Sequence, residues 1–360
     1  MLRKWINIER VIHSIKTAAA VTIGFLLTRL VGFPADQWIV ITILVVMCSQ
    51  IYVGSVIQKA YLRFLGTIGG CLGATFALVM FGHTNMTIAI TLGFASFIFS
   101  YLATSQESLT YAGTLGAVTT AIIMLGQTPT IAFAAERFLE ISAGILIATL
   151  VSQFFLPIHA RTHLRREQAL TLEHLRNYYI AVMTPTREKA TTLAYQEFEE
   201  LIVQSILKQR KLAKESIREP LGSLYDPKKF ALTLYAEREL LRSITFMHTA
   251  LMHIKKTEYS WLTLPEINLF NETIMTALNH LIQVIDKNYR ETEVILLPDL
   301  SILKLNLKLQ MSKASSEDLI YMNGLLFSAE IVVNSLERLA KLYGFSVCDN
   351  TLPAGENNPS

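Results

Sequence analysis

Two basic residues stand at the edge of an apolar stretch in the N-terminal half of this chain. Lys59 and Arg63 are four residues apart, so on a helix they share one face. Neighbouring cations at a membrane surface attract anions, which can be the head groups of acidic lipids or dissolved organic anions. Lys16 lies inside an earlier apolar segment. Its amino group either reaches back to the membrane surface or adds positive charge to a path for anions.

A second charged cluster, formed by Glu136, Arg137 and Glu140, stands where the last apolar segment begins. On a helix, Glu136 and Glu140 share a face, and Arg137 can reach Glu140 three residues further on. Glu140 lies about one turn inside the apolar region, where an ionisable side chain is costly and commonly functional. The cluster is therefore either an ion pair that anchors the end of a helix or a site where Glu140 takes up a proton.

Small residues follow the first basic pair. Gly66 and Gly70 are four apart, as are Gly69 and Gly73. Within lipid, such small-residue pairs let two helix backbones approach closely, so this face should contact another helix. Thr114, in a segment rich in hydroxyl groups, either packs against a neighbouring helix or lines a polar path.

The composition places these residues in a membrane domain. Of the 360 residues, 51% are hydrophobic and only 17% are charged. Residues 1–157 hold 8 of the 32 basic and 5 of the 29 acidic residues. Six apolar segments approach the length of about 20 residues that a spanning helix needs. They are Ile12–Val31, Trp38–Val56, Phe64–Phe81, Met86–Ala103, Leu109–Leu125 and Phe138–Leu156. The basic residues flank the side of the membrane that holds both termini, so the positive-inside rule predicts cytoplasmic termini.

The remaining sequence predicts a helical bundle in the cytoplasm. Apolar residues recur at intervals of three and four through residues 158–345. Asp226-Pro227 and Leu264-Pro265 are typical helix starts, and Gly344 is placed to end the last helix. The segment between residues 292 and 309 fits either a short helix or a packed loop. Residues 346–360 have the composition of a disordered tail. The fold class is therefore all-α, with a six-span domain followed by a cytoplasmic bundle.

No catalytic or nucleotide-binding motif is present. The sequence contains no GxxxxGK[ST] loop and no HExxH, CxxC or GxSxG pattern. The three cysteines are too few and too scattered for a disulfide framework. The balanced charge of the C-terminal part gives no indication of nucleic-acid binding. We therefore expect no enzyme activity, no metal or other cofactor, and no nucleic-acid partner.

Three stretches, in order, resemble one known family. They are Asp36-Gln-Trp38, then Arg63-Phe-Leu-Gly66-Thr-Ile-Gly69-Gly70, and finally Arg137-Phe-Leu-Glu140-Ile-Ser-Ala-Gly144. Their order over residues 10–157 is similar to that of the fusaric acid resistance / aromatic acid exporter family. The resemblance implies an exporter of small aromatic or other organic acids in the bacterial inner membrane. It also implies use of the proton gradient and a periplasmic adaptor protein as a possible partner.

Three functions follow from these features. A proton-coupled exporter of organic anions needs a titrating group such as Glu140, whereas a passive anion channel does not. A membrane scaffold without transport would tolerate neutralisation of Lys59, Arg63 and Glu140 with changes in stability alone. Because longer members of the family hold two six-span units and this chain holds one, we expect a homodimer. Apolar positions such as Leu325, Leu326, Val332 and Val333 would contribute to its interface.

Overall fold

The computed structural model divides the chain into two compact units, which are described separately. Unit 1 comprises residues 1–160 and 215–223, and unit 2 comprises residues 161–214 and 224–360. The boundary therefore falls after residue 160, three residues beyond the one expected, and a short later segment belongs with the N-terminal helices. The structure describes residues 8–31, 37–106, 108–126, 129–183, 192–219, 225–254, 264–287, 294–311 and 316–349.

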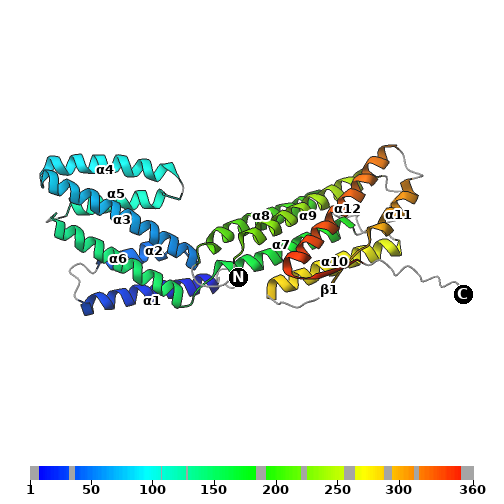
Figure 1. The fold of residues 1–360 in the computed structure, drawn as a ribbon, viewed down its shortest axis with the longest axis horizontal. Coiled ribbons are helices and arrows are strands. Elements are labelled where there is room, and N and C mark those ends of the chain that lie inside the picture. The colour runs from blue at the N-terminus through cyan, green and yellow to red at the C-terminus, as the bar shows by residue number, and fades with distance from the viewer. Residues whose placement is uncertain are drawn as a thin grey trace. The chain divides into compact units, whose positions relative to one another are not determined.

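In its described residues, unit 1 contains six apolar helices (Figure 1). They are α1 (Ile8–Val31), α2 (Gln37–Met47), α3 (Val53–Phe81), α4 (Asn85–Ser105), α5 (Thr110–Met124) and α6 (Ile131–Phe154). Helices α3, α4 and α5 pack against one another, while α1, α2 and α6 form a second group that α3 joins through α6. Length and apolar composition alone make α1, α3 and α4 candidate membrane spans, and α2 and α5 are shorter apolar helices.

The boundary between the second and third helices differs from the sequence prediction. The second apolar segment was expected to run to Val56, but α2 ends at Met47 and α3 begins at Val53. Apolarity continues across this break, so hydropathy alone does not reveal it. As a result, Lys59 and Arg63 lie within the second and third turns of α3 and not in a loop before it.

The described residues of unit 2 form a helical bundle with one small sheet. Its helices are α7 (Ala160–Met183), α8 (Thr192–Ser216), α9 (Pro227–His253), α10 (Pro265–Lys287), α11 (Leu300–Met311) and α12 (Ser316–Tyr343). Both proline-marked helix starts are confirmed, and the Asp226 side chain accepts a hydrogen bond from the Lys228 amide at 2.9 Å. Gly344 ends α12 with a φ of 89°, a backbone angle that favours glycine.

The sheet corrects two expectations. Strand β1 (Val294–Leu297) pairs in parallel with β2 (Ser346–Asp349), with Val294 opposite Ser346. The segment between residues 292 and 309 was expected to be a short helix or a packed loop; α11 confirms a short helix from Leu300 onward, whereas residues 294–297 form a strand that was not expected. Residues 346–349 are not part of a disordered tail, while the remaining tail residues lie outside the described part of the chain. Four-residue strands are too short to give a recognisable alternation, which is why the sequence did not reveal them.

The core of unit 2 is apolar and contains the residues that we expected at a dimer interface. Leu325 and Val332 are 2% and 1% exposed, and Val333 is also buried. Leu326 is partly buried against the same core. These side chains stabilise the bundle itself, so the expectation that they meet a second copy is wrong. The same burial explains why α12 is apolar enough to resemble a membrane span.

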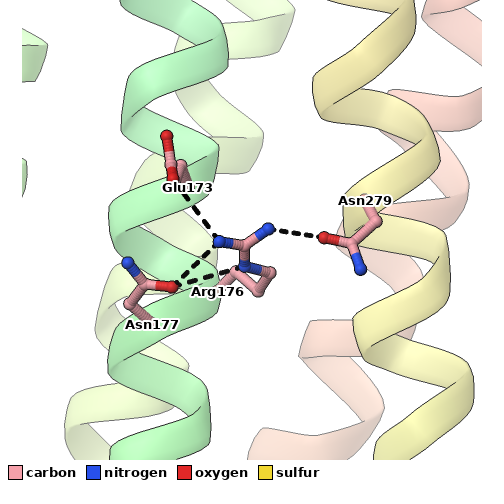
Figure 2. Close-up of polar contacts among 4 residues, drawn as sticks. All are labelled: Glu173, Arg176, Asn177 and Asn279. Atoms are coloured by element: carbon pink, nitrogen blue, oxygen red, sulfur yellow. Dashed lines mark hydrogen bonds and ion pairs between the residues drawn. The ribbon is translucent and has the colours of Figure 1, made fainter.

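Polar ties also link the helices of unit 2. Arg176 on α7 donates to Asn279 Oδ1 on α10 at 2.5 Å (Figure 2). The Nε and Nη2 atoms of the same guanidinium donate to Asn177 Oδ1, and Nη2 lies 3.5 Å from Glu173 Oε1. The guanidinium thus has an acceptor on each side, which fixes α7 against α10.

Candidate functional site

Lys16 is a buried cation in the middle of α1. Its side chain is fully buried, and its amino nitrogen has no hydrogen-bond partner. It therefore does not extend to the surface, as an interfacial lysine would. His13, one turn earlier and also buried, approaches the Cys48 carbonyl oxygen through Nε2 at 3.4 Å. A charged amino group without a partner is costly in an apolar environment, so this position favours an anion nearby.

Arg63 is a second buried cation, on α3. It is 2% exposed, and its Nε atom has no hydrogen-bond partner. The Tyr111 hydroxyl and the Cys71 thiol are within electrostatic range of its guanidinium. Tyr111 itself is held by its hydroxyl, which donates to the Val45 carbonyl oxygen at 3.3 Å. The guanidinium is therefore positioned between α3 and α5.

Lys59 lies one turn before Arg63 and is only half-buried. Its amino group donates to Ser49 Oγ at 2.6 Å and lies 5.0 Å from the centre of the Tyr111 ring. The Tyr111 ring and the Ser49 hydroxyl hold the ammonium group in place. Because both are neutral, the positive charge of Lys59 is not cancelled. Lys59 and Arg63 thus approach the same tyrosine, and we call Lys59, Arg63 and Tyr111 the α3 basic cluster.

Arg137 and Glu140 form a closed ion pair on α6. Arg137 Nη2 donates to Glu140 Oε1 at 3.0 Å, and Nη1 lies 2.7 Å from Oε2. Both side chains are buried, and the guanidinium also lies over the rings of Trp38 at 5.7 Å and Phe133 at 5.0 Å. Arg137 therefore has a carboxylate and two aromatic faces as partners.

Glu136 and Thr114 do not join these groups. Glu136 is exposed, while Glu140, four residues later, is buried, so the two do not share an environment as the spacing suggested. Thr114 is exposed on α5, and its hydroxyl donates to the Thr110 carbonyl oxygen at 2.8 Å. Its neighbours Thr119 and Thr120 are the buried hydroxyl residues of that helix.

The glycine face of α3 meets two different helices. A Cβ atom at Gly66 would lie 2.6 Å from the Ala112 carbonyl oxygen, and one at Gly70 would lie 2.6 Å from the Gly116 carbonyl oxygen. Both neighbours belong to α5. Gly69 instead faces the Phe99 ring of α4 at 3.4 Å. Gly73 has no neighbour within 4 Å, so the close contact expected there is absent.

The described part of α1–α6 therefore has more buried positive than negative charge. Its buried basic side chains are Lys16, Arg63 and Arg137, and Glu140 is its one buried acid. Because Arg137 already neutralises Glu140, the charges of Lys16 and Arg63 have no counter-charge among these residues. Thr42 and Ser152, both fully buried, also have hydroxyl groups without hydrogen-bond partners. Each of these groups lacks a partner for its charge or its hydroxyl group.

Several of these features could not be read from sequence spacing. Tyr111 and Ser49 are far from Lys59 along the chain, and only packing brings them together. His13 gave a weak signal, because it precedes Lys16 by three residues. The described residues contain no group of three or more His, Cys, Asp or Glu side chains that could hold a metal ion.

The apolar helices and buried charges define a multi-pass α-helical membrane protein. Residues 10–215, more than half of the chain, match the fusaric acid resistance protein family. The chain belongs to this family.

Curated relatives agree with this assignment. The inner membrane protein YeeA of Escherichia coli K12 is 28% identical over 176 residues, 49% of each chain. A UPF0421 protein of Bacillus cereus is 31% identical over 161 residues, 44% of this chain and 42% of that one. The p-hydroxybenzoic acid efflux pump subunit AaeB of Escherichia coli O9:H4 is 24% identical over 174 residues, 44% of this chain and 26% of that protein. This chain thus matches half or less of the length of these relatives.

Proposed function

We propose that this protein exports small aromatic or other organic acids across the bacterial inner membrane, driven by the proton gradient. The observation that carries the proposal is the fully buried Lys16 amino group, which has no hydrogen-bond partner. Organic acids are anions near neutral pH, and a carboxylate would supply the missing counter-charge. The similarity to a p-hydroxybenzoic acid efflux pump subunit supports aromatic acids as the substrate class.

The α3 basic cluster would capture the anion from the cytoplasm. In the proposed topology both termini are cytoplasmic, and Lys59 and Arg63 lie near the cytoplasmic start of α3. Lys59 is half-buried and keeps its charge uncancelled, so it can attract an approaching carboxylate. Arg63, one turn deeper, can then hold the carboxylate with two parallel hydrogen bonds.

The Arg137–Glu140 pair would couple export to protons. While Glu140 is ionised it holds Arg137 in the closed pair. A proton on Glu140 removes its negative charge, and the released guanidinium can attract the anion outward. The proton then leaves when the pair closes again. Glu136, exposed on the same helix, would relay protons at the surface of the pair.

Two partners belong to the proposal. One is a second copy of the chain, since 174 matched residues make up only 26% of the AaeB subunit. The other is a periplasmic adaptor protein, which would carry the exported acid away from the membrane. Membrane lipid would cover the remaining apolar surface of the spanning helices.

Transport into inside-out vesicles tests the function directly. Vesicles containing the protein should accumulate p-hydroxybenzoate and related aromatic acids when a proton gradient is imposed, and lose the accumulated acid when the gradient is collapsed. Equal fluxes with and without the gradient would instead favour the passive anion channel. No flux of any acid in the panel, with folded protein in the membrane, would favour the scaffold.

A further inference from the structure

Glu237 is a fully buried acid in the core of unit 2. It lies on α9, 0% exposed, and no basic side chain of the described residues pairs with it. Glu167 on α7, also buried, differs because Lys208 Nζ lies 2.5 Å from its Oε2 atom. An ionised carboxylate at the position of Glu237 would therefore be an uncompensated buried charge, which is strongly unfavourable.

The hydrogen bonds around Glu237 leave two acceptors without donors. Gln209 on α8 donates from Nε2 to Glu237 Oε2 at 2.8 Å and to Thr171 Oγ1 on α7 at 2.7 Å. These two bonds use both of its amide hydrogens. The Thr171 hydroxyl donates to the Glu167 carbonyl oxygen at 2.8 Å. Glu237 Oε1 and Gln209 Oε1 are buried and have no hydrogen-bond partner. The cluster thus lacks a donor, in contrast to the matched network around Arg176 (Figure 2).

One proton on Glu237 would remove the uncompensated charge and would also supply a hydrogen-bond donor. A protonated Glu237 is neutral and gains an O–H group that can donate to a neighbouring acceptor. Burial raises the pKa of Glu237 to about 8, the Gln209 hydrogen bond lowers it in part, and the negative charge of Glu167 raises it further. The site is therefore adjusted to hold a proton near neutral pH.

We propose that Glu237, Gln209 and Thr171 form a proton-binding site that holds α7, α8 and α9 together when it is occupied. The charged and titratable groups around it are Glu167 on α7, its partner Lys208 on α8, and Tyr343 at the end of α12. The Tyr343 hydroxyl lies 3.5 Å from Thr233 Oγ1 and donates to Gln168 Oε1 at 3.4 Å. Tyr343 stays neutral because burial raises its pKa. Arg165 lies near Tyr343, and Lys229 Nζ is 4.2 Å from the centre of the Tyr343 ring.

The direction of the pH effect follows from linkage. The folded site binds its proton more tightly than an ordinary glutamate, whose pKa is 4.5. The stabilisation is therefore complete below pH 4.5 and is lost as the pH rises to about 8. Over this range, the equilibrium constant for opening the bundle should rise about tenfold per pH unit and then level off. Acidification tightens the bundle, and alkalinisation loosens it.

Hydrogen exchange of the full-length protein in detergent micelles tests this site. Between pH 6 and pH 8, peptides from α9 of the wild type should show an increase in opening of about 50-fold relative to Glu237→Gln measured at the same pH values. Glu239→Gln is the matched control, because Glu239 lies on the same helix and pairs with Arg242 nearer the surface. It should follow the wild type.

Identical pH dependence in the wild type and Glu237→Gln would overturn the proposal. If Glu237→Gln does not fold, infrared titration of the wild type gives an independent answer. A carboxylic acid band that disappears with a midpoint near pH 8 supports the site, and its absence at pH 6 contradicts it. Neither experiment measures transport, so either result leaves the proposed export function to be judged separately.

Discussion

At the scale of single residues, pairing distinguishes the buried charges of the membrane unit. Arg137 and Glu140 neutralise each other in an ion pair, whereas Lys16 has no partner for its amino group. Each buried cation is costly in lipid by about 2.5–3.5 kcal/mol on insertion scales. A closed pair is sufficient to stabilise a helix, but an unpaired buried cation needs another reason to be there. An anionic substrate supplies one.

Replacing Glu140 separates coupling from capture. Glu140→Gln should abolish the dependence of export on the proton gradient, because the amide can neither bind nor release a proton. The amide remains able to accept a hydrogen bond from Arg137, so the protein should still fold and insert. The measurement is the pH profile of uptake into vesicles, with Glu239→Gln in unit 2, which lies outside the proposed coupling pair, as the control. An unaltered pH profile in Glu140→Gln would favour the channel.

Arg63 should affect substrate capture more than coupling. Arg63→Ala removes a guanidinium that is 2% exposed and in range of Tyr111. We expect the half-saturating concentration of substrate to rise by about tenfold, equivalent to about 1.4 kcal/mol of binding free energy. The dependence on the gradient should persist. An unchanged half-saturating concentration would place the substrate away from α3.

At the scale of elements, α3 is held against α5 by backbone contact at two glycines. Gly66 and Gly70 lie on this contact, and the Thr120 hydroxyl of α5 is 3.3 Å from the Gly70 carbonyl oxygen. Gly73, one turn beyond Gly69, faces open space. The same helix therefore offers a sensitive position and a tolerant one.

Gly70→Leu and Gly73→Leu form a matched pair. At Gly70 even a Cβ atom would lie 2.6 Å from a backbone oxygen, which cannot move without shifting α5. Gly70→Leu should therefore reduce the free energy of unfolding by about 1–3 kcal/mol through overpacking. This loss should appear as a lower melting temperature and a lower yield of folded protein. Gly73→Leu should behave like the wild type. Equal melting temperatures for the two variants would show that the contact between α3 and α5 does not determine stability.

The sequence predicted the helices better than their boundaries. Strong hydropathy identified six apolar segments in the N-terminal part. In the C-terminal part, Asp226 marked the start of a helix and Gly344 marked the end of one, and the structure confirms both. The break between α2 and α3 was not predicted, because both sides of it are apolar. The strands β1 and β2 were not predicted either, because each is only four residues long.

Side-chain environments were less predictable than helices. The spacing of Arg137 and Glu140 was enough to expect their ion pair, since both lie on one helix. Whether Lys16 is buried depends on how α1 packs, and its sequence neighbours carry no signal for that. The Glu237 site needs three helices that are far apart in sequence, so no local pattern could indicate it.

At the scale of the whole molecule, two units carry distinct buried chemistry. Unit 1 holds unpaired positive charge among apolar helices, and unit 2 holds in its core an acid, Glu237, whose Oε1 atom lacks a donor. Helix α4 is the most exposed helix of unit 1 by its side chains, with Phe97 and Tyr101 each 73% exposed. Lipid or a second copy of the chain must cover this apolar face in a membrane.

Amine crosslinking in native membranes tests the proposed homodimer. A dimer should appear as a crosslinked species of twice the 40.4 kDa chain mass, at a yield that is independent of expression level. Crosslinking after solubilisation in detergent serves as the comparison. Only monomer in native membranes, under conditions that crosslink a known membrane dimer, would contradict the proposal.

Binding of p-hydroxybenzoate to the protein in lipid nanodiscs, measured by titration calorimetry, tests the role of Lys16 directly. The wild type should bind, and Lys16→Gln should weaken binding by about tenfold or more, because the substitution removes the buried charge that we assign to the anion. Arg29→Gln, an exposed basic residue in the last turn of the same helix, should bind as the wild type does. Equal affinity in Lys16→Gln and the wild type would contradict the proposal that the unpaired buried charge of Lys16 holds the transported anion.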